Sequence, residues 1–207
     1  SDLKIMKIYQ LFPEPVCTCS LERKLTQEEL RIINEYKKET HKNEGNITSN
    51  NNYVLENKTL KNLKKDLHTK VMDYFDKVIC TDSPITPYIT QSWINYTKSD
   101  QFHHQHNHPN SYASGVFYIS ADKEVDSITF YKPNVEDRIK LHVIKHNPFN
   151  STTLRFPVET GNVFLFPSRL VHGVDRKKGT NTRISLSFNV FFKGTIGNKA
   201  NLTELVL

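Results

Sequence analysis

The densest concentration of chemically versatile side chains is a short histidine segment. The chain contains nine histidines, and His103, His104, His106 and His108 stand close together, just ahead of a strand-like run that starts at Tyr112. Residues i and i+2 of an extended segment point to the same side, so His104, His106 and His108 can all face one cavity. Imidazole is the commonest protein ligand for metals. The spacing therefore predicts a metal site, and an exposed polar loop is the alternative.

A further metal ligand should come from a different strand, and the apolar segment 162–174 contains His172. Turn-forming residues follow at 175–181, and then another strand-like run begins. A hairpin here, with its tip near Lys177, would place His172 opposite Arg183, with both side chains on one face. We expect this pairing to bring the arginine next to the metal.

The strand that begins near Arg183 has one polar and one apolar face. Its polar side chains are Arg183, Ser185, Ser187 and Asn189, and they alternate with Ile184, Leu186, Phe188 and Val190. In a closed barrel the apolar face can lie under helices while the polar face lines a pocket. An arginine there suits bidentate recognition of a carboxylate, and the Ser185 hydroxyl can add a hydrogen bond. An ordinary surface ion pair is the alternative for Arg183.

Two helices and a series of strands must position these residues. Thr26 and Glu29 match a capping box at the start of one helix, and apolar residues recur at three- and four-residue steps over 60–78. The Asn-rich segment 43–52 between them is predicted to be an exposed loop. Further along, the apolar period changes to two, which is typical of strands. Strands are expected near 88–97, 112–120, 126–131, 139–146, 162–167, 170–174 and 182–192.

Short strands preceded by two helices indicate a mainly β fold, a sandwich or jelly-roll barrel with the helices on one outer face. We expect a single domain over 1–207, with helical support in 1–85, a β core in 86–194 and a tail in 195–207. The chain is 37% hydrophobic and 24% charged, which excludes general disorder. A domain of this size buries roughly 70% of its unfolded surface and folds without metal. A metal site is therefore expected to serve function.

Apolar runs and cysteines bear on the compartment. No apolar run approaches the ~18 residues of a membrane span, and the first residues lack the basic and apolar regions of a signal peptide. Cys17, Cys19 and Cys80 are an odd number without C-x-x-C spacing, which favours a reducing compartment and inert thiols. We expect a cytoplasmic protein with no membrane partner. The net charge of +6 fits either an anionic partner or a solvated surface.

Several motifs occur in a specific order. They are H-x-H-P-N-S, S-G-V-F-Y, a strand ending in F-P-S, L-V-H and R-I-S-L-S-F-N. The ordered set resembles the 2-oxoglutarate and iron(II)-dependent oxygenase superfamily, and it is similar to a family of oxygenases found in bacteria and marine phages. The resemblance runs from about Trp93 to Phe192, roughly half the chain, and Leu11 to Val16 match more weakly. A viral protein of this kind would act in the host-cell cytoplasm.

The resemblance implies a double-stranded β-helix that binds iron(II) and 2-oxoglutarate. It assigns His106 and His172 as iron ligands, and Arg183 with Ser185 as the pair that grips the distal carboxylate of 2-oxoglutarate. The superfamily usually has an acidic residue where this chain has His108. Either His108 is the third ligand or water takes its place. Tyr118 and Asn95 are further candidates to bind 2-oxoglutarate, and His103 and His104 are neighbours without an assigned role.

The implied reaction couples oxidative decarboxylation of 2-oxoglutarate to succinate with dioxygen-dependent hydroxylation of an unidentified substrate. A peptide, a small molecule and a nucleic acid are all candidates, and specificity is expected in the loops 43–52 and 132–150. Several basic side chains lie in the segment 132–150. They favour an acidic partner, or they form a solvated surface without a partner. They are Lys132, Arg138, Lys140, His142, Lys145 and His146.

Two other functions remain open. A three-histidine cupin-type dioxygenase would need no keto acid. Such an enzyme is expected to have a Glu shortly after H-x-H and a Gly before the last histidine, and this chain has neither. It would also give Arg183 and Ser185 no role. A non-catalytic β domain would bind zinc structurally and nucleic acid through its basic helix. Structural zinc sites normally have four ligands, often cysteines, and Cys17 and Cys19 are distant in sequence.

Overall fold

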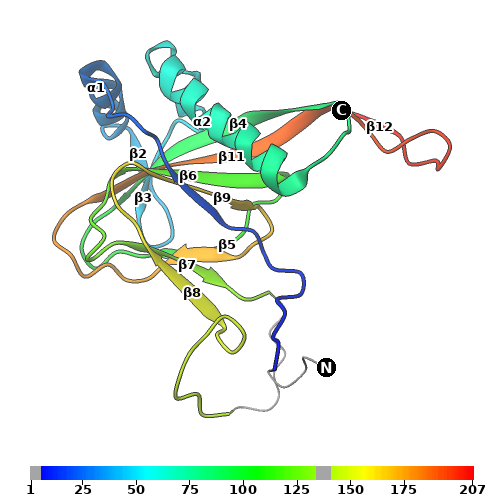
Figure 1. The fold of residues 1–207 in the computed structure, drawn as a ribbon. Coiled ribbons are helices and arrows are strands. Elements are labelled where there is room, and N and C mark those ends of the chain that lie inside the picture. Colours follow the sequence, from blue (N-terminus) through cyan, green and yellow to red (C-terminus); the bar gives the residue numbers. More distant parts are fainter. Residues whose placement is uncertain (1–5, 134–140) are drawn as a thin grey trace.

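Residues 6–133 and 141–207 are described by a computed structural model of the chain, in which two antiparallel sheets face each other (Figure 1). The strands of the larger sheet are β1 (Cys17–Ser20), β2 (Thr40–Lys42), β3 (Ile47–Ser49), β4 (Ile85–Thr97), β6 (Ala113–Ser120), β9 (Asn162–Pro167), β11 (Arg183–Ile196) and β12 (Leu205–Val206). Their order is β1–β9–β6–β11–β4–β3–β2, and β12 pairs with β11.

The smaller sheet consists of β5 (His103–His106), β7 (Ser127–Tyr131), β8 (Thr153–Pro157) and β10 (His172–Val174). Its order is β5–β10–β7–β8, so β10 lies between two strands that precede it in the sequence. Two facing antiparallel sheets with helices on one outer face form the double-stranded β-helix, as predicted.

The two helices lie over the larger sheet (Figure 1). Helix α1 (Gln27–Tyr36) begins at the predicted capping box, since Thr26 Oγ1 accepts from the Glu29 amide at 3.2 Å and the Glu29 carboxylate accepts from the Thr26 amide at 2.8 Å. Helix α2 (Lys61–Tyr74) continues into a π-helical turn at Phe75–Ile79. None of the helices in the described part of the chain has the length and apolar composition that a bilayer span requires.

The core has two parts, one on each side of the larger sheet. The apolar stripe of α2, including Leu63 and Leu67, packs with Leu186 and Phe188 from the apolar face of β11. A smaller cluster between the two sheets contains Phe130. The predicted alternation of β11 is therefore confirmed, and its polar face is turned toward the space between the sheets.

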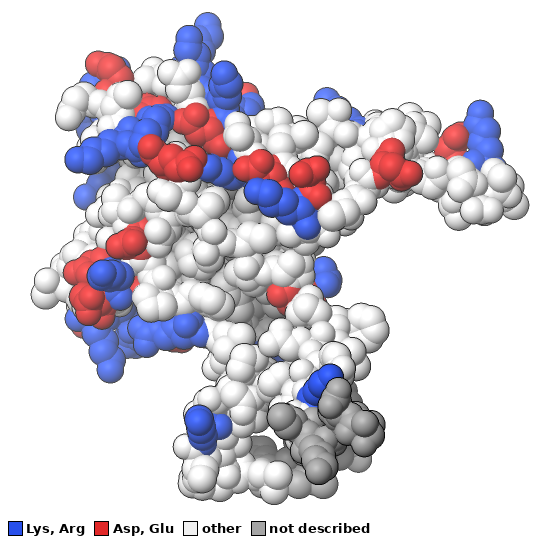
Figure 2. Space-filling model, in the orientation of Figure 1, with Lys and Arg blue, Asp and Glu red and all other residues white. Residues whose placement is uncertain are grey.

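Charged side chains of both signs mix over the helices (Figure 2). Arg31 of α1 is paired with Glu28 at 2.9 Å and with Glu35 at 2.6 Å, and Lys64 of α2 is paired with Glu56 at 2.6 Å. These exposed pairs each contribute little to stability. Over the helices, the positive charge is balanced locally and forms no single basic patch on the face shown.

Two sequence predictions about the elements need correction. The strand expected at 139–146 is wrong over 141–146, which is irregular, and residues 139–140 lie outside the described residues. The edge of the smaller sheet is instead β8, a later segment that pairs with β7. The loop expected at 43–52 contains β3, because Thr48 Oγ1 donates to the Ile94 carbonyl and β3 extends the larger sheet beside β4.

Candidate active site

Three histidines converge where the smaller sheet meets the turn after β5. His172, the first residue of β10, pairs directly with His106 of β5, and His108 follows two residues later. The ring centroids lie 4.4 Å apart for His106 and His172, and 5.1 Å apart for His108 and each of the other two. One ring nitrogen from each histidine lies within 4.8 Å of the other two. This spacing suits a single metal ion.

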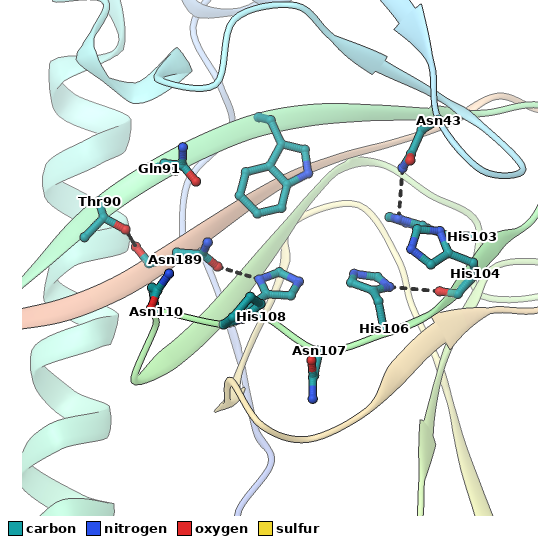
Figure 3. Close-up of a pocket in the computed structure, with 12 residues that line it drawn as sticks. Asn43, Thr90, Gln91, His103, His104, His106, Asn107, His108, Asn110 and Asn189 are labelled. Carbon is teal, nitrogen blue, oxygen red and sulfur yellow. Dashed lines mark hydrogen bonds between the residues drawn. The ribbon is translucent and has the colours of Figure 1, made fainter.

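The other nitrogen of each ring is already engaged. Each Nδ1 donates a hydrogen bond to an oxygen that can only accept, which places the proton on Nδ1 and leaves a lone pair on Nε2. The acceptors are the His104 carbonyl for His106 at 2.8 Å, the Leu170 carbonyl for His172 at 2.9 Å and the Asn189 side-chain oxygen for His108. Metal-ligating histidines are oriented in this way, and Figure 3 shows the bonds of His106 and His108.

Burial keeps these imidazoles neutral. Desolvation, reinforced by the neighbouring histidines, lowers the pKa of His172 to about 3, and desolvation lowers the pKa of His106 to about 4. The pKa of His108 is also lowered, again mainly by burial. Neutral imidazole is the form that binds metal, so the three rings are ready to act as ligands near pH 7.

Two pockets meet at His106. An outer cavity of about 580 Å³ is lined by His106 and His108, and a much smaller inner pocket is lined by His106 and His172. The inner pocket lies between the two sheets and reaches Arg183 and Ser185 on β11. The proposed histidine ligands therefore lie between a wide outer cavity and a smaller inner pocket.

Arg183 is a buried cation without a counter-ion. The residue is 2% exposed, its Nη1 donates to the Ser127 carbonyl at 3.1 Å, and its Nε has no hydrogen-bond partner among the described residues. Within 6–133 and 141–207, no carboxylate lies at ion-pairing distance from it. Its guanidinium lies 5.8 Å from the ring centre of Tyr118. Burial of an unpaired charge is costly, so this pocket is suited to an anionic ligand.

The central part of the chain matches a known protein family. Residues 91–189 match the family described as "Putative 2OG-Fe(II) oxygenase", and this range contains the three histidines, Arg183 and Ser185. Residues 91–189 are therefore a domain of the 2-oxoglutarate and iron(II)-dependent oxygenases. No curated protein is significantly similar to it in sequence.

Solved structures of other oxygenases share the fold. An oxidoreductase of the 2OG-Fe(II) oxygenase family from Burkholderia pseudomallei is 16% identical with a TM-score of 0.55, covering 84% of this chain and 83% of that one. HygX from Streptomyces hygroscopicus, with nickel, 2-oxoglutarate and hygromycin B bound, is 13% identical with a TM-score of 0.58 over 86% and 82%. A prolyl hydroxylase from Trichoplax adhaerens, in complex with a hypoxia inducible factor peptide fragment, is 13% identical with a TM-score of 0.57 over 85% and 83%.

Iron(II) and 2-oxoglutarate are the cofactors of these oxygenases, and the chemistry of the side chains at the two pockets fits both. The neutral imidazoles with free Nε2 atoms fit the metal, and the unpaired guanidinium of Arg183 fits a carboxylate. The site departs from the usual two-histidine, one-carboxylate face, because the histidine groups of the described residues include no carboxylate and no cysteine. The motif order predicts that His108 replaces the usual carboxylate, and one of its ring nitrogens lies within 4.8 Å of a ring nitrogen of His106 and of His172.

One sequence prediction about this oxygenase site is wrong. His172 and Arg183 are not neighbours in a hairpin, because β10 pairs with β5 and β7, whereas β11 pairs with β4 and β6. The segment between them crosses from the smaller to the larger sheet. Lys177 anchors this crossing through an ion pair with the buried Asp126 at 3.4 Å. The two residues still line the same inner pocket, from opposite sheets.

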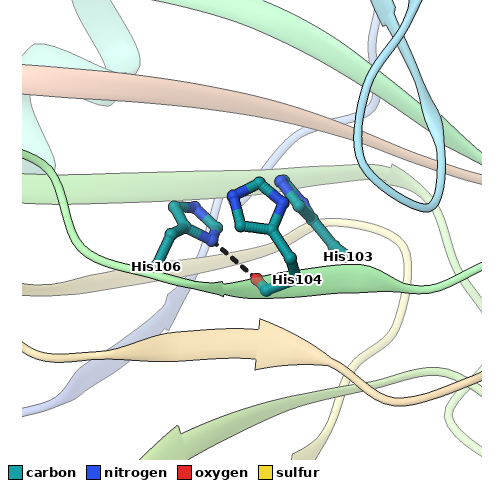
Figure 4. A group of neighbouring side chains, drawn as sticks. All are labelled: His103, His104 and His106. Carbon is teal, nitrogen blue, oxygen red and sulfur yellow. Dashed lines mark hydrogen bonds between the residues drawn. The ribbon is translucent and has the colours of Figure 1, made fainter.

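His103 and His104 lie closer to the oxygenase site than the sequence indicated (Figure 4). His103 lines both pockets, stacks on His106 with ring centroids 4.5 Å apart, and accepts a hydrogen bond from Asn43 Nδ2 at 3.2 Å. His104 lies beside Glu44, whose carboxylate is 4.0 Å from its Nδ1. His103, His104 and His106 form a second trio with nitrogens within 4.8 Å of one another.

The remaining predicted residues lie in the inner pocket, with partners that were not predicted. Tyr118 and Asn95 both line it, and Asn95 Nδ2 donates to Ser187 Oγ at 3.0 Å. Asn189 was recognised only as part of the polar face of β11, yet it orients His108. The alternation that predicts a pocket-facing Arg183 also places Asn189 on the same polar face of β11, so that signal was present in the sequence.

Proposed function

We propose that this oxygenase is a hydroxylase that converts 2-oxoglutarate to succinate while hydroxylating an uncharged polar substrate. The observation that carries the proposal is the position of His106, which lines both the outer cavity and the inner pocket. The inner pocket is also lined by Arg183, whose Nε has no hydrogen-bond partner among the described residues. Such a site keeps the cosubstrate inside and admits the prime substrate from outside.

His106, His108 and His172 would hold iron(II). Bound iron(II), together with 2-oxoglutarate and dioxygen, supplies the oxidising power for C–H hydroxylation. The protein contributes ligand orientation through the three Nδ1 hydrogen bonds. Three neutral ligands leave the full charge of the cation to attract a dianionic cosubstrate.

Arg183 and Ser185 would bind the distal carboxylate of 2-oxoglutarate. The hydroxyl of Ser185 lies on the same face of β11 as the guanidinium, two residues away. Asn95 and Tyr118 would donate hydrogen bonds along the pocket. Burial raises the pKa of Tyr118 to about 12, so its phenol stays protonated and serves as a donor.

The outer cavity would bind the prime substrate. Among the described residues that line it, none other than the histidines can carry a charge. The lining contains the aromatic ring of Trp93 and several amide side chains, namely Asn43, Gln91, Asn107, Asn110 and Asn189. Amide side chains both donate and accept, so they suit uncharged groups such as a peptide main chain or a neutral small molecule. This lining speaks against the acidic substrate that the basic region 132–150 suggested.

Product analysis tests this function. Protein supplied with iron(II), 2-oxoglutarate and air should form succinate and a product heavier by one oxygen from an uncharged peptide or metabolite pool, detected by mass spectrometry. Arg183→Gln should abolish both products, and His142→Ala, an exposed histidine in an irregular segment, should form them normally. Succinate formation that survives Arg183→Gln unchanged would contradict the proposal.

A further inference from the structure

Two buried side chains near Arg183 have polar atoms without a partner. Thr97 is fully buried and Asn46 is 3% exposed. Among the described residues, neither Thr97 Oγ1 nor the Nδ2 and Oδ1 atoms of Asn46 have a hydrogen-bond partner. Arg183 Nε is in the same state. Buried polar groups are almost always hydrogen-bonded, so three neighbouring side chains that each keep at least one polar atom without a partner indicate a common cause.

The three residues form one row across three neighbouring strands. Arg183 on β11 pairs with Thr97 on β4. Asn46 immediately precedes Ile47, the first residue of β3, and Ile47 pairs with Tyr96 on β4. In an antiparallel sheet this register places Asn46 level with Thr97. Asn46 therefore extends the row from the hairpin that joins β2 and β3.

Strand alternation turns Arg183 and Thr97 toward the space between the two sheets. The sequence neighbours Ile47, Tyr96 and Ile184 all pack in the core under the helices. Successive side chains of a strand point to opposite faces, so Thr97 and Arg183 lie on the face between the two sheets. Two residues away on that same face, Asn95 and Ser185 line the inner pocket.

Each member of the row offers an unused donor, namely the guanidinium Nε–H, the Thr97 hydroxyl and the Asn46 amide. Donors that surround a buried cation favour an anion with several acceptor oxygens. We infer that Arg183, Thr97 and Asn46 form an extended carboxylate-binding subsite, in which Thr97 and Asn46 donate to the distal carboxylate of 2-oxoglutarate. The inference rests on the proposed function and adds residues that the R-x-S pattern does not contain.

Part of this subsite comes from outside the family match. The match covers residues 91–189, whereas Asn46 belongs to the N-terminal hairpin. The same hairpin contacts the start of the histidine strand, since the Gly45 carbonyl accepts from the Phe102 amide at 3.1 Å and Asn43 donates to His103. The hairpin thus links the carboxylate subsite to the metal-binding strand.

A pair of keto acids tests the subsite. 2-Oxopentanoate has the metal-binding end of 2-oxoglutarate and a methyl group in place of the distal carboxylate. Dissociation constants of both acids are measured anaerobically with iron(II) protein, by calorimetry. Thr97→Val should weaken 2-oxoglutarate binding about tenfold, the usual effect of losing a hydrogen bond to a charged group, and leave 2-oxopentanoate binding unchanged. Asn46→Asp adds a negative charge beside the distal carboxylate and should weaken 2-oxoglutarate binding further.

Three controls make the outcome decisive. Thr97→Ser keeps the hydroxyl and should retain the affinity for 2-oxoglutarate. Thr86→Val makes the same substitution at an exposed position of β4 and should change neither constant. The inference is overturned if Thr97→Val leaves 2-oxoglutarate binding intact, or weakens both acids equally, because the carboxylate is then not involved. If wild-type protein binds neither acid, the proposed function itself fails.

Discussion

His172 lies directly opposite His106 in the pairing of β10 with β5, and their ring centroids are 4.4 Å apart. Each ring is fixed by an Nδ1 hydrogen bond to a main-chain carbonyl two residues earlier. The two strands thus fix the orientation of two proposed metal ligands, and His108, held by a side chain, is the proposed third ligand.

The contact between Asn189 and His108 tests whether His108 is a ligand. Asn189→Leu removes the acceptor for His108 Nδ1, and loss of such a supporting partner typically weakens metal binding 10–100-fold. Titration with Co²⁺, followed by its visible spectrum, measures the effect. Gln91→Leu removes another amide from the same cavity without touching a histidine and should have no effect. Equal affinities in the two variants would exclude His108 as a ligand.

Replacing His108 by the residue usual in the superfamily should separate metal from cosubstrate binding. In His108→Asp, a carboxylate still binds the metal, but it neutralises part of the positive charge that attracts the dianionic 2-oxoglutarate. Metal affinity should hold or rise while the dissociation constant for 2-oxoglutarate increases. Calorimetric titration of the metal-free variant with iron(II) measures the metal affinity. Titration of the metal-loaded variant with 2-oxoglutarate measures the dissociation constant of the cosubstrate. Tighter 2-oxoglutarate binding would show that charge at this position does not control cosubstrate affinity.

The metal-free protein should lose stability as the pH falls below 6.5. The folded-state pKa values of His106 and His172, about 4 and about 3, lie below the unfolded value of 6.5, so the unfolded chain binds more protons in this window. Each histidine should remove on the order of 1 kcal/mol of unfolding free energy per pH unit. Urea unfolding between pH 7 and 4 measures this slope. A double His106→Asn, His172→Asn variant should show a shallower slope, and an identical slope would contradict the prediction.

Gly115 is required by the packing between β6 and β11. A Cβ at this position would lie 2.1 Å from the ring of Phe188, its partner across the two strands. Gly115→Ala should therefore destabilise the fold by about 1–3 kcal/mol, as overpacked cores do. Thermal unfolding measures the loss, and Gly115→Ala combined with Phe188→Leu should recover part of it. A Gly115→Ala protein as stable as the wild type would contradict this packing.

Local patterns predicted much of the site. The alternation of β11 places Arg183 and Ser185 toward the pocket, and the i, i+2 spacing brings His106 and His108 to one side; both features depend only on neighbouring residues. The capping box at Thr26 is equally local and was confirmed.

Long-range pairing was not predictable in the same way. The turn-rich segment after His172 can close a hairpin or cross between sheets, and the choice depends on the buried pair of Lys177 with Asp126, which are far apart in sequence. Likewise, Ile47 and its Asn-rich neighbours resemble a loop until β4 provides the strand beside which they pair. The contribution of Asn46 and Thr97 follows only from that register.

Anaerobic addition of 2-oxoglutarate to the iron(II)-loaded protein tests the central claim most directly. Chelation of the metal by the keto acid should produce a visible metal-to-ligand charge-transfer band. The band should disappear in His172→Ala, should need far more 2-oxoglutarate in Arg183→Gln, and should be normal in His142→Ala. A wild-type protein that shows no band at any 2-oxoglutarate concentration would contradict the account.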